Sequence, residues 1–144
     1  MTHRKHLKNK KKIVVKVGTS LLAYDNGKIN LQRMEKLVRV LADLHNSGKE
    51  VILVSSGAVG AGVGMLGLDE KPTDLVKKQA LAAIGQVGLL RLYQKFFDEY
   101  SKTVAQVLLT RDGIENSLRR KNARNTLNEL VSMGPVSYTH LRAH

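Results

Sequence analysis

The stretch EVILVSSGAVGAGVGMLG, residues 50–67, is the part of the chain from which we predict the fold. Its first half contains the run Val51–Val54, whose β-branched and apolar residues are typical of a buried parallel strand. The run ends at Ser55-Ser56-Gly57, and glycines follow at positions 60, 62, 64 and 67. A strand that ends in small residues and turns toward a helix leaves backbone N–H groups unpaired, and those donors can bind an anion. The stretch therefore predicts a site for phosphate or carboxylate groups.

A second strand is predicted earlier in the chain, at Lys12–Val17 (KIVVKV). Lys16 lies inside this apolar run and immediately before Gly18-Thr19-Ser20. One interpretation is a lysine at an edge, which extends its charge into water. We favour a functional interpretation, because ligands of open α/β sheets bind in the crevice at the carboxyl ends of the parallel strands.

An amphipathic helix is predicted between these two strands, with an N-cap at Asn30 and a stop at Ser47-Gly48. Strand, helix and strand of this length form a right-handed βαβ unit, so both strands should end at the same edge of the sheet. Gly18-Thr19-Ser20 and Ser55-Ser56-Gly57 would then face one another across a crevice.

The remaining sequence continues the alternation of helices and strands. Residues 75–100 predict a long helix, in which Gly85 and Gly88 indicate close packing or a bend. A third strand is predicted at 103–109 and a further helix at 116–133, so the fold class is α/β, a sandwich with a mostly parallel sheet. Residues 135–144 lose strand-like character after Val136. We therefore expect an exposed sheet edge there and poor solubility.

Composition excludes several classes of protein. The 144 residues suffice for one domain with its own core, and no apolar run approaches the length of a membrane span. The absence of cysteine excludes disulfides and cysteine-ligated zinc, which is compatible with the cytoplasm, and no His, Asp or Glu cluster has the spacing of metal ligands. The G-x-G-x-x-G match at positions 62, 64 and 67 is weak, because it lies well after the strand end.

The net charge of +12 is concentrated at the start of the chain, where residues 4–12 hold six lysines and arginines. We predict that residues 1–11 form a basic disordered tail, because charge runs are usually solvated. A non-enzymatic RNA-binding module, acting through this tail and Arg119–Arg124, stays open as an alternative.

Five blocks of sequence, in order, resemble the glutamate 5-kinases (gamma-glutamyl kinases) of the amino-acid-kinase family. The resemblance covers residues 12–134, and implies the N-terminal half of an α/β/α kinase domain, truncated in this chain. It also implies transfer of the γ-phosphoryl group of ATP to the side-chain carboxylate of L-glutamate, the first step of proline synthesis. The blocks are KIVVKVGTSLL (12–22), VILVSSGAVGAG (51–62), KQALAAIGQ (78–86), QVLLTRDG (106–113) and NARNTLNELVSMG (122–134).

The resemblance assigns roles to residues of both strand ends. Lys16 corresponds to the catalytic lysine that contacts the ATP phosphates, and Gly18, Thr19 and Ser20 correspond to the phosphate turn. Ser56, with Gly57 and Ala58 beside it, corresponds to the glutamate site. The resemblance also implies ATP and Mg²⁺ as cofactors and a cytoplasmic, homo-oligomeric enzyme. It implies no nucleic-acid or membrane partner.

The sequence departs from the family after Gly134. The family continues there into further elements that include a second phosphate-contacting lysine and the nucleotide pocket, whereas residues 135–144 form a tail unlike the family. We therefore expect the 144-residue chain alone to be inactive. An enzyme of the same fold with another small acceptor stays open as a second alternative.

Overall fold

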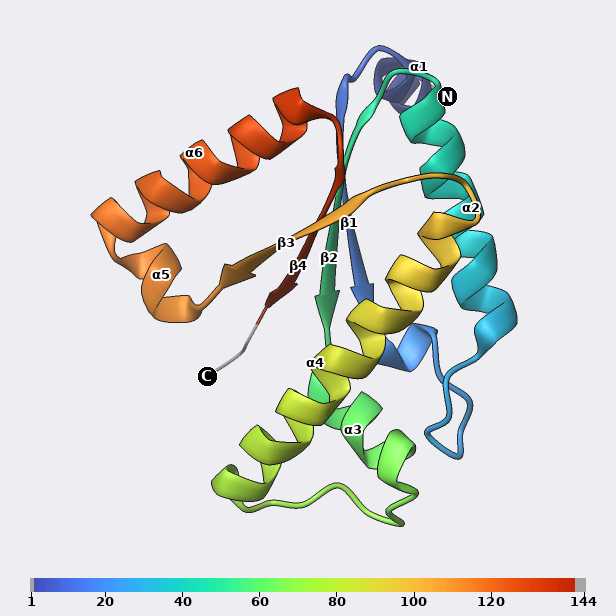
Figure 1. The fold of residues 1–144 in the computed structure, drawn as a ribbon, viewed down its shortest axis with the longest axis vertical. Coiled ribbons are helices and arrows are strands. Elements are labelled where there is room, and N and C mark those ends of the chain that lie inside the picture. The colour runs from blue at the N-terminus through green and yellow to red at the C-terminus, as the bar shows by residue number, and fades with distance from the viewer. Residues whose placement is uncertain (1, 142–144) are drawn as a thin grey trace.

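The protein is described from a computed structural model, which describes residues 2–141 (Figure 1). Four parallel strands form one sheet in the order β1-β2-β4-β3. The elements, in chain order, are α1 (Thr2–Lys8), β1 (Lys12–Gly18), the 3-10 turn η1 (Thr19–Leu21), α2 (Leu31–Asn46), β2 (Glu50–Ser56), α3 (Ala58–Leu66), α4 (Leu75–Asp98), β3 (Val104–Leu109), α5 (Arg111–Glu115), α6 (Ser117–Met133) and β4 (Val136–Leu141).

Helices cover both faces of the sheet. Helices α2 and α4 lie on one face, and α6 lies on the other (Figure 1). Right-handed crossovers explain this arrangement, because the path from β1 through β2 to β3 runs in one direction across the sheet and the path from β3 to β4 runs back. The structure confirms the predicted α/β sandwich with a parallel sheet.

The hydrophobic core lies between the sheet and the helices α2 and α4. Every second strand residue points into it, because side chains alternate between the two faces of a strand. Burying each large apolar side chain contributes about 1.5–3 kcal/mol. The buried members are Val17, Leu22, Met34, Val38, Leu41, Ala42, Val51, Leu53, Tyr93, Phe97, Val136 and Tyr138.

Helix α2 begins and ends where the sequence predicts. The side-chain oxygen of Asn30 accepts a hydrogen bond from the backbone N–H of Arg33 at 3.1 Å, which caps the first turn. The helix ends at Asn46, with Ser47 as its C-cap, and Gly48 follows with a φ of 95°. Glycine suits this position because a positive φ strains residues with a side chain.

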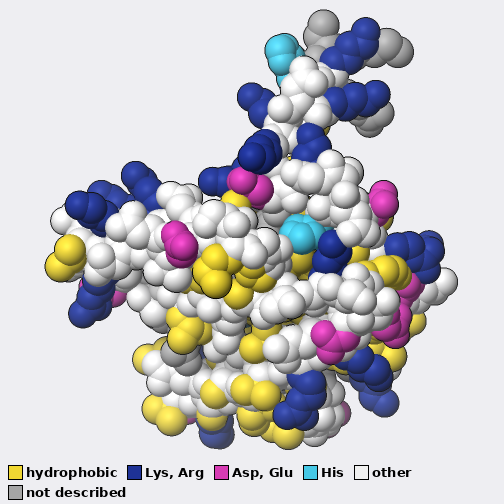
Figure 2. Space-filling model, turned by 45° about the horizontal axis from the view of Figure 1, so that its top comes forward, with side chains coloured by type: hydrophobic (Ala, Val, Ile, Leu, Met, Phe, Trp, Pro, Cys, Tyr) yellow, Lys and Arg dark blue, Asp and Glu magenta, His cyan; other side chains and the backbone are white. Residues whose placement is uncertain are grey.

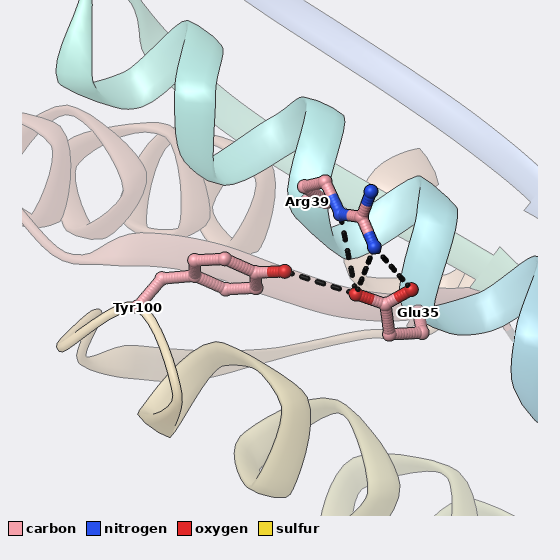
Figure 3. A network of polar contacts seen from close by, with 3 residues as sticks. All are labelled: Glu35, Arg39 and Tyr100. Carbon is pink, nitrogen blue, oxygen red and sulfur yellow. Dashed lines mark hydrogen bonds and ion pairs between the residues drawn. The ribbon is translucent and has the colours of Figure 1, made fainter.

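Glu35, Arg39 and Tyr100 form a polar network that joins α2 to the turn after α4 (Figure 3). Nη2 of Arg39 donates to both carboxylate oxygens of Glu35, at 2.9 and 3.0 Å, and the hydroxyl of Tyr100 donates to Oε1 at 3.0 Å. The hydrogen-bonded guanidinium of Arg39, followed by the hydroxyl of Tyr100, lowers the pKa of Glu35. The network therefore links the two helices that cover the core.

We expect this network to stabilise the fold at neutral pH and to be lost in acid. The pKa of Glu35 is lowered from its ordinary value of 4.5, so its contribution is complete above that pH and declines as the pH falls through the lowered pKa. Glu35→Gln should lower the melting temperature at pH 7, and the deficit should shrink as the pH falls below 4.5. Thermal melting followed by circular dichroism measures it, with Glu70→Gln in an exposed loop as the control. A deficit that does not change with pH would contradict the expectation.

The N-terminal residues form a helix where the sequence predicts a disordered tail. Helix α1 spans Thr2–Lys8, and the described lysines of this segment project from the body of the molecule (Figure 2). The ammonium group of Lys49 donates to the carbonyl oxygens of Lys8 at 2.7 Å and Lys10 at 2.5 Å. A cation that satisfies carbonyls at the end of a helix stabilises that end, which is the physical reason for the difference.

The C-terminal residues form the strand β4, which corrects the expectation of an exposed edge after Val136. β4 pairs with β2 on one side and β3 on the other, so it occupies the middle of the sheet. Val136 and Tyr138 face the core, and the ring of Tyr138 lies 5.3 Å from the ring of Tyr93. The space between β2 and β3 therefore decides the structure of a segment that has little strand character of its own. Residues 142–144 of the expected tail lie outside the described part of the chain.

Candidate active site

The ends of β1 and β2 meet, as the sequence predicts. The two strands are in parallel register, with Lys16 beside Val54 and Gly18 beside Ser56. The 3-10 turn η1 follows β1 directly, and α3 begins two residues after Ser56. Two turns rich in small residues therefore lie side by side at the carboxyl edge of the sheet.

Two hydroxyl groups lie close to Gly18, the last residue of β1. A Cβ placed on this glycine would lie 3.8 Å from the Oγ of Ser20 and 3.9 Å from the Oγ of Ser56. One hydroxyl comes from each turn, so the two turns share this small space. The side chain of Thr19, which the resemblance places in the same turn, lies outside the described residues.

Lys16 lies on the face of the sheet opposite the α2–α4 core. Its neighbour on that face of β1, Val14, is 59% exposed, and Lys16 is exposed as well. Helix α6 covers the same face farther along the sheet, and it contributes no buried residue to the described structure. The side chain of Lys16 is therefore exposed to solvent near the carboxyl end of β1, where an anionic ligand can reach it.

Gly57 turns the chain from β2 into α3. Its φ of 82° and ψ of 30° are left-handed, a conformation in which glycine is strongly favoured. Glycine has no side chain with which to cap α3, so the first backbone N–H groups of the helix receive no hydrogen bond from their N-cap residue. The positive end of the α3 dipole adds to their attraction for an anion.

The glycines after position 57 have a different role from the expected anion cradle. Gly60, Gly62 and Gly64 lie within α3, so the G-x-G-x-x-G match does not form a turn at the strand end. A Cβ on Gly62 would overlap the carbonyl group of Leu81 in α4, and one on Gly64 would overlap the carbonyl of Gly27. Sequence reasoning missed these contacts. The lack of polar residues in AVGAGVGML was a signal for a packed helix.

The hydrophobic core contains a tyrosine whose pKa is shifted. Burial raises the pKa of the Tyr93 hydroxyl, with Tyr138 nearby as a second cause, and both side chains lie in the core.

Among the described residues, no group of three or more His, Cys, Asp or Glu side chains could hold a metal ion. No helix within residues 2–141 is long and apolar enough to cross a membrane.

Comparison with known proteins places the chain in a family. The sequence model described as the amino acid kinase family matches residues 11–140. The chain belongs to the amino acid kinase family. Membership confirms the resemblance seen in the five sequence blocks. The family's match extends past Gly134 through most of β4, although the sequence predicts a tail unlike the family at 135–144.

Curated relatives in this amino acid kinase family share the name glutamate 5-kinase. The chain is 58% identical to the enzyme of Clostridium perfringens over 133 residues, which are 92% of this chain and 49% of the relative. It is 54% identical to the enzyme of Listeria welshimeri, over 92% of this chain and 48% of that relative. The chain therefore spans about half the length of the curated relatives it matches. These matches do not support the alternative of a non-enzymatic RNA-binding module.

A solved structure shows the same fold. The isopentenyl phosphate kinase of T. acidophilum, in its product complex, superposes with a TM-score of 0.62 over 94% of this chain and 58% of that chain. At 15% sequence identity, the similarity concerns the fold alone.

Proposed function

We propose that this amino acid kinase is a glutamate 5-kinase, which uses ATP to phosphorylate the side-chain carboxylate of L-glutamate to L-glutamyl 5-phosphate. The observation that carries the proposal is the meeting of Gly18 and Ser56 at one sheet edge, in a chain 58% identical to a relative of that name. This reaction is the first step of proline synthesis. A cytoplasmic location and a homo-oligomeric enzyme belong to the same proposal, since ATP and glutamate are both available in the cytoplasm.

The two turns would bind different substrates. In the phosphate turn, Gly18–Ser20, the small glycine lets the phosphates approach the backbone and Ser20 donates a hydrogen bond, while Lys16 neutralises phosphate charge. In the acceptor turn, Ser56–Ala58, the hydroxyl and the first N–H groups of α3 hold the glutamate carboxylate. A carboxylate oxygen then attacks the γ-phosphorus, a new O–P bond forms, and the bond to ADP breaks. Such a reaction depends mainly on positioning and charge neutralisation, which these groups supply.

Mg²⁺ is proposed only as a companion of ATP. The described residues hold no cluster of carboxylates or imidazoles suited to a metal ion, so we derive no step through one. Magnesium is commonly bound by substrate phosphates with one or two carboxylates, and the ion would then arrive with the nucleotide.

We expect the 144-residue chain alone to form no glutamyl phosphate, because the chain spans about half of its relatives. Trapping of glutamyl phosphate as the hydroxamate, with ATP and glutamate present, is the assay. Measurable hydroxamate from the purified chain would contradict this expectation.

A chimeric kinase tests the proposed function itself. In this chimera, residues 1–134 of the chain are joined to the part of the Clostridium perfringens relative that follows the position matching Gly134. We expect it to phosphorylate L-glutamate in preference to other small acids and to isopentenyl phosphate. Preference for another acceptor would show that the acceptor turn serves a different substrate and would refute the proposal.

A further inference from the structure

Helix α3 depends on its neighbours for its position. Three of its nine residues are glycines, and each weakens a helix by about 1 kcal/mol relative to alanine. Its first residue, Ala58, belongs to the acceptor turn, so a shift of α3 moves that turn. Whatever fixes α3 against α4 therefore also fixes the acceptor turn.

Gly85 of α4 lies directly against the first turn of α3. A Cβ at position 85 would overlap the carbonyl group of Ala58 and lie 2.9 Å from the backbone nitrogen of Gly62. Gly85 is buried, and Ala58 is 2% exposed. Both obstructing groups are backbone, so they yield only if the whole helix moves. A single methyl group at position 85 would therefore push α3 away from α4.

A reciprocal contact, from Gly62 of α3 to α4, also holds the two helices close together. A Cβ on Gly62 of α3 would overlap the carbonyl of Leu81, one turn before Gly85 on α4. Each helix thus presents a glycine to a carbonyl of the other, as small residues do where two helix backbones approach closely. Gly88, almost one turn farther along α4, differs, since a Cβ there would meet the end of the Met65 side chain. That side chain is flexible and can move aside.

We propose that Gly85 is a positioning residue for the acceptor turn. It does not touch the substrate; it acts through the carbonyl of Ala58, by letting α3 approach α4 closely enough to place the first N–H groups of α3 beside Ser56. The inference rests on the proposed function for its substrate, glutamate, and on the contacts of α3 and α4 for its geometry.

The kinetic test compares Gly85→Ala with Gly88→Ala in the chimeric kinase. Both variants add one methyl group to α4 and raise its helix propensity equally, so Gly88→Ala is a matched control. Gly85→Ala is expected to raise the KM for glutamate roughly tenfold or more, because small misplacements of binding groups have large effects. The KM for ATP should change by less than about twofold, and Gly88→Ala should leave both KM values within that range.

A general loss of stability would give a different result. It would lower the amount of active enzyme, and hence the apparent kcat, without separating the KM for glutamate from the KM for ATP. Equal KM ratios in the two variants would overturn the proposal and leave the proposed function intact.

Amide NMR of the 144-residue chain gives a readout that does not depend on activity. Gly85→Ala is expected to shift the signals of Ser56, Gly57 and Ala58, whereas Gly88→Ala leaves them in place. Unshifted signals in Gly85→Ala would overturn the proposal whatever the chimera does. Shifted signals with a chimera that phosphorylates no glutamate would support the positioning contact and refute the proposed function.

Hydrogen exchange in the unaltered chain decides the question if Gly85→Ala does not fold. The N–H of Ala61 bonds to the carbonyl of Gly57 at 3.2 Å, within the first turn of α3. If α4 holds that turn, the amide of Ala61 is expected to be protected about as well as that of the buried Leu89 in α4. Much faster exchange of Ala61 would show that the turn moves independently and would overturn the proposal.

Discussion

Lys16→Met in the chimeric kinase is expected to lower kcat by about 10²–10³-fold, the usual effect of removing one preorganised group that stabilises charge in the transition state. Methionine keeps most of the length of the side chain and removes its positive charge. Because Lys16 is exposed, the melting temperature should not change appreciably. Steady-state kinetics and a thermal melt on the same preparation measure the two effects.

Lys12→Met is the matched control for Lys16→Met. Lys12 is another exposed lysine of β1, on the same face of the strand and at its opposite end. Its replacement removes the same charge from the protein, so it reports the effect of net charge alone. An equal loss of kcat in both variants would remove Lys16 from the proposed mechanism.

The second large effect is expected from the two serines that flank Gly18. Ser56→Ala should raise the KM for glutamate by about 10–100-fold, since a hydrogen bond to a charged group contributes about 1.5–3 kcal/mol. Ser20→Ala should raise the KM for ATP instead, because the phosphate turn follows β1 and the acceptor turn follows β2. Initial rates with each substrate varied in turn separate the two constants.

Measuring both KM values in both serine variants tests whether the two turns bind different substrates. Both substitutions remove one hydroxyl oxygen that lies within 4 Å of the same point beside Gly18. If both variants changed the same KM, the division into a phosphate turn and an acceptor turn would be wrong, even with the kinase activity intact.

The parts of the fold that local chemistry decides could be predicted from the sequence. Asn30 caps α2 and Gly48 follows its end because the side-chain oxygen and the positive φ are properties of those residue types. The meeting of Gly18 and Ser56 follows from the handedness of one βαβ unit. The contact between the ends of β1 and β2 could thus be predicted from elements that are adjacent in the sequence.

Contacts between distant residues could not be predicted in this way. Gly85 could indicate close packing or a bend, and only the structure shows that it faces the carbonyl of Ala58, which lies 27 residues away. The segment VSYTHL becomes β4 because β2 and β3 leave a gap for a strand, although its own strand character is weak. Helix α1 forms beside Lys49, whose ammonium satisfies carbonyls that no local pattern pairs.

The place of β4 in the sheet also sets an order of events during synthesis. Strands β2 and β3 are joined only through β4, whose residues are the last of the described chain to leave the ribosome. The βαβ unit that brings Gly18 to Ser56 can pair as soon as residue 56 emerges, whereas β3 waits for residues 136–141 before it joins the sheet. A nascent chain would therefore bring Gly18 and Ser56 together first and would carry an unpaired edge on β2 for about 80 residues of further translation.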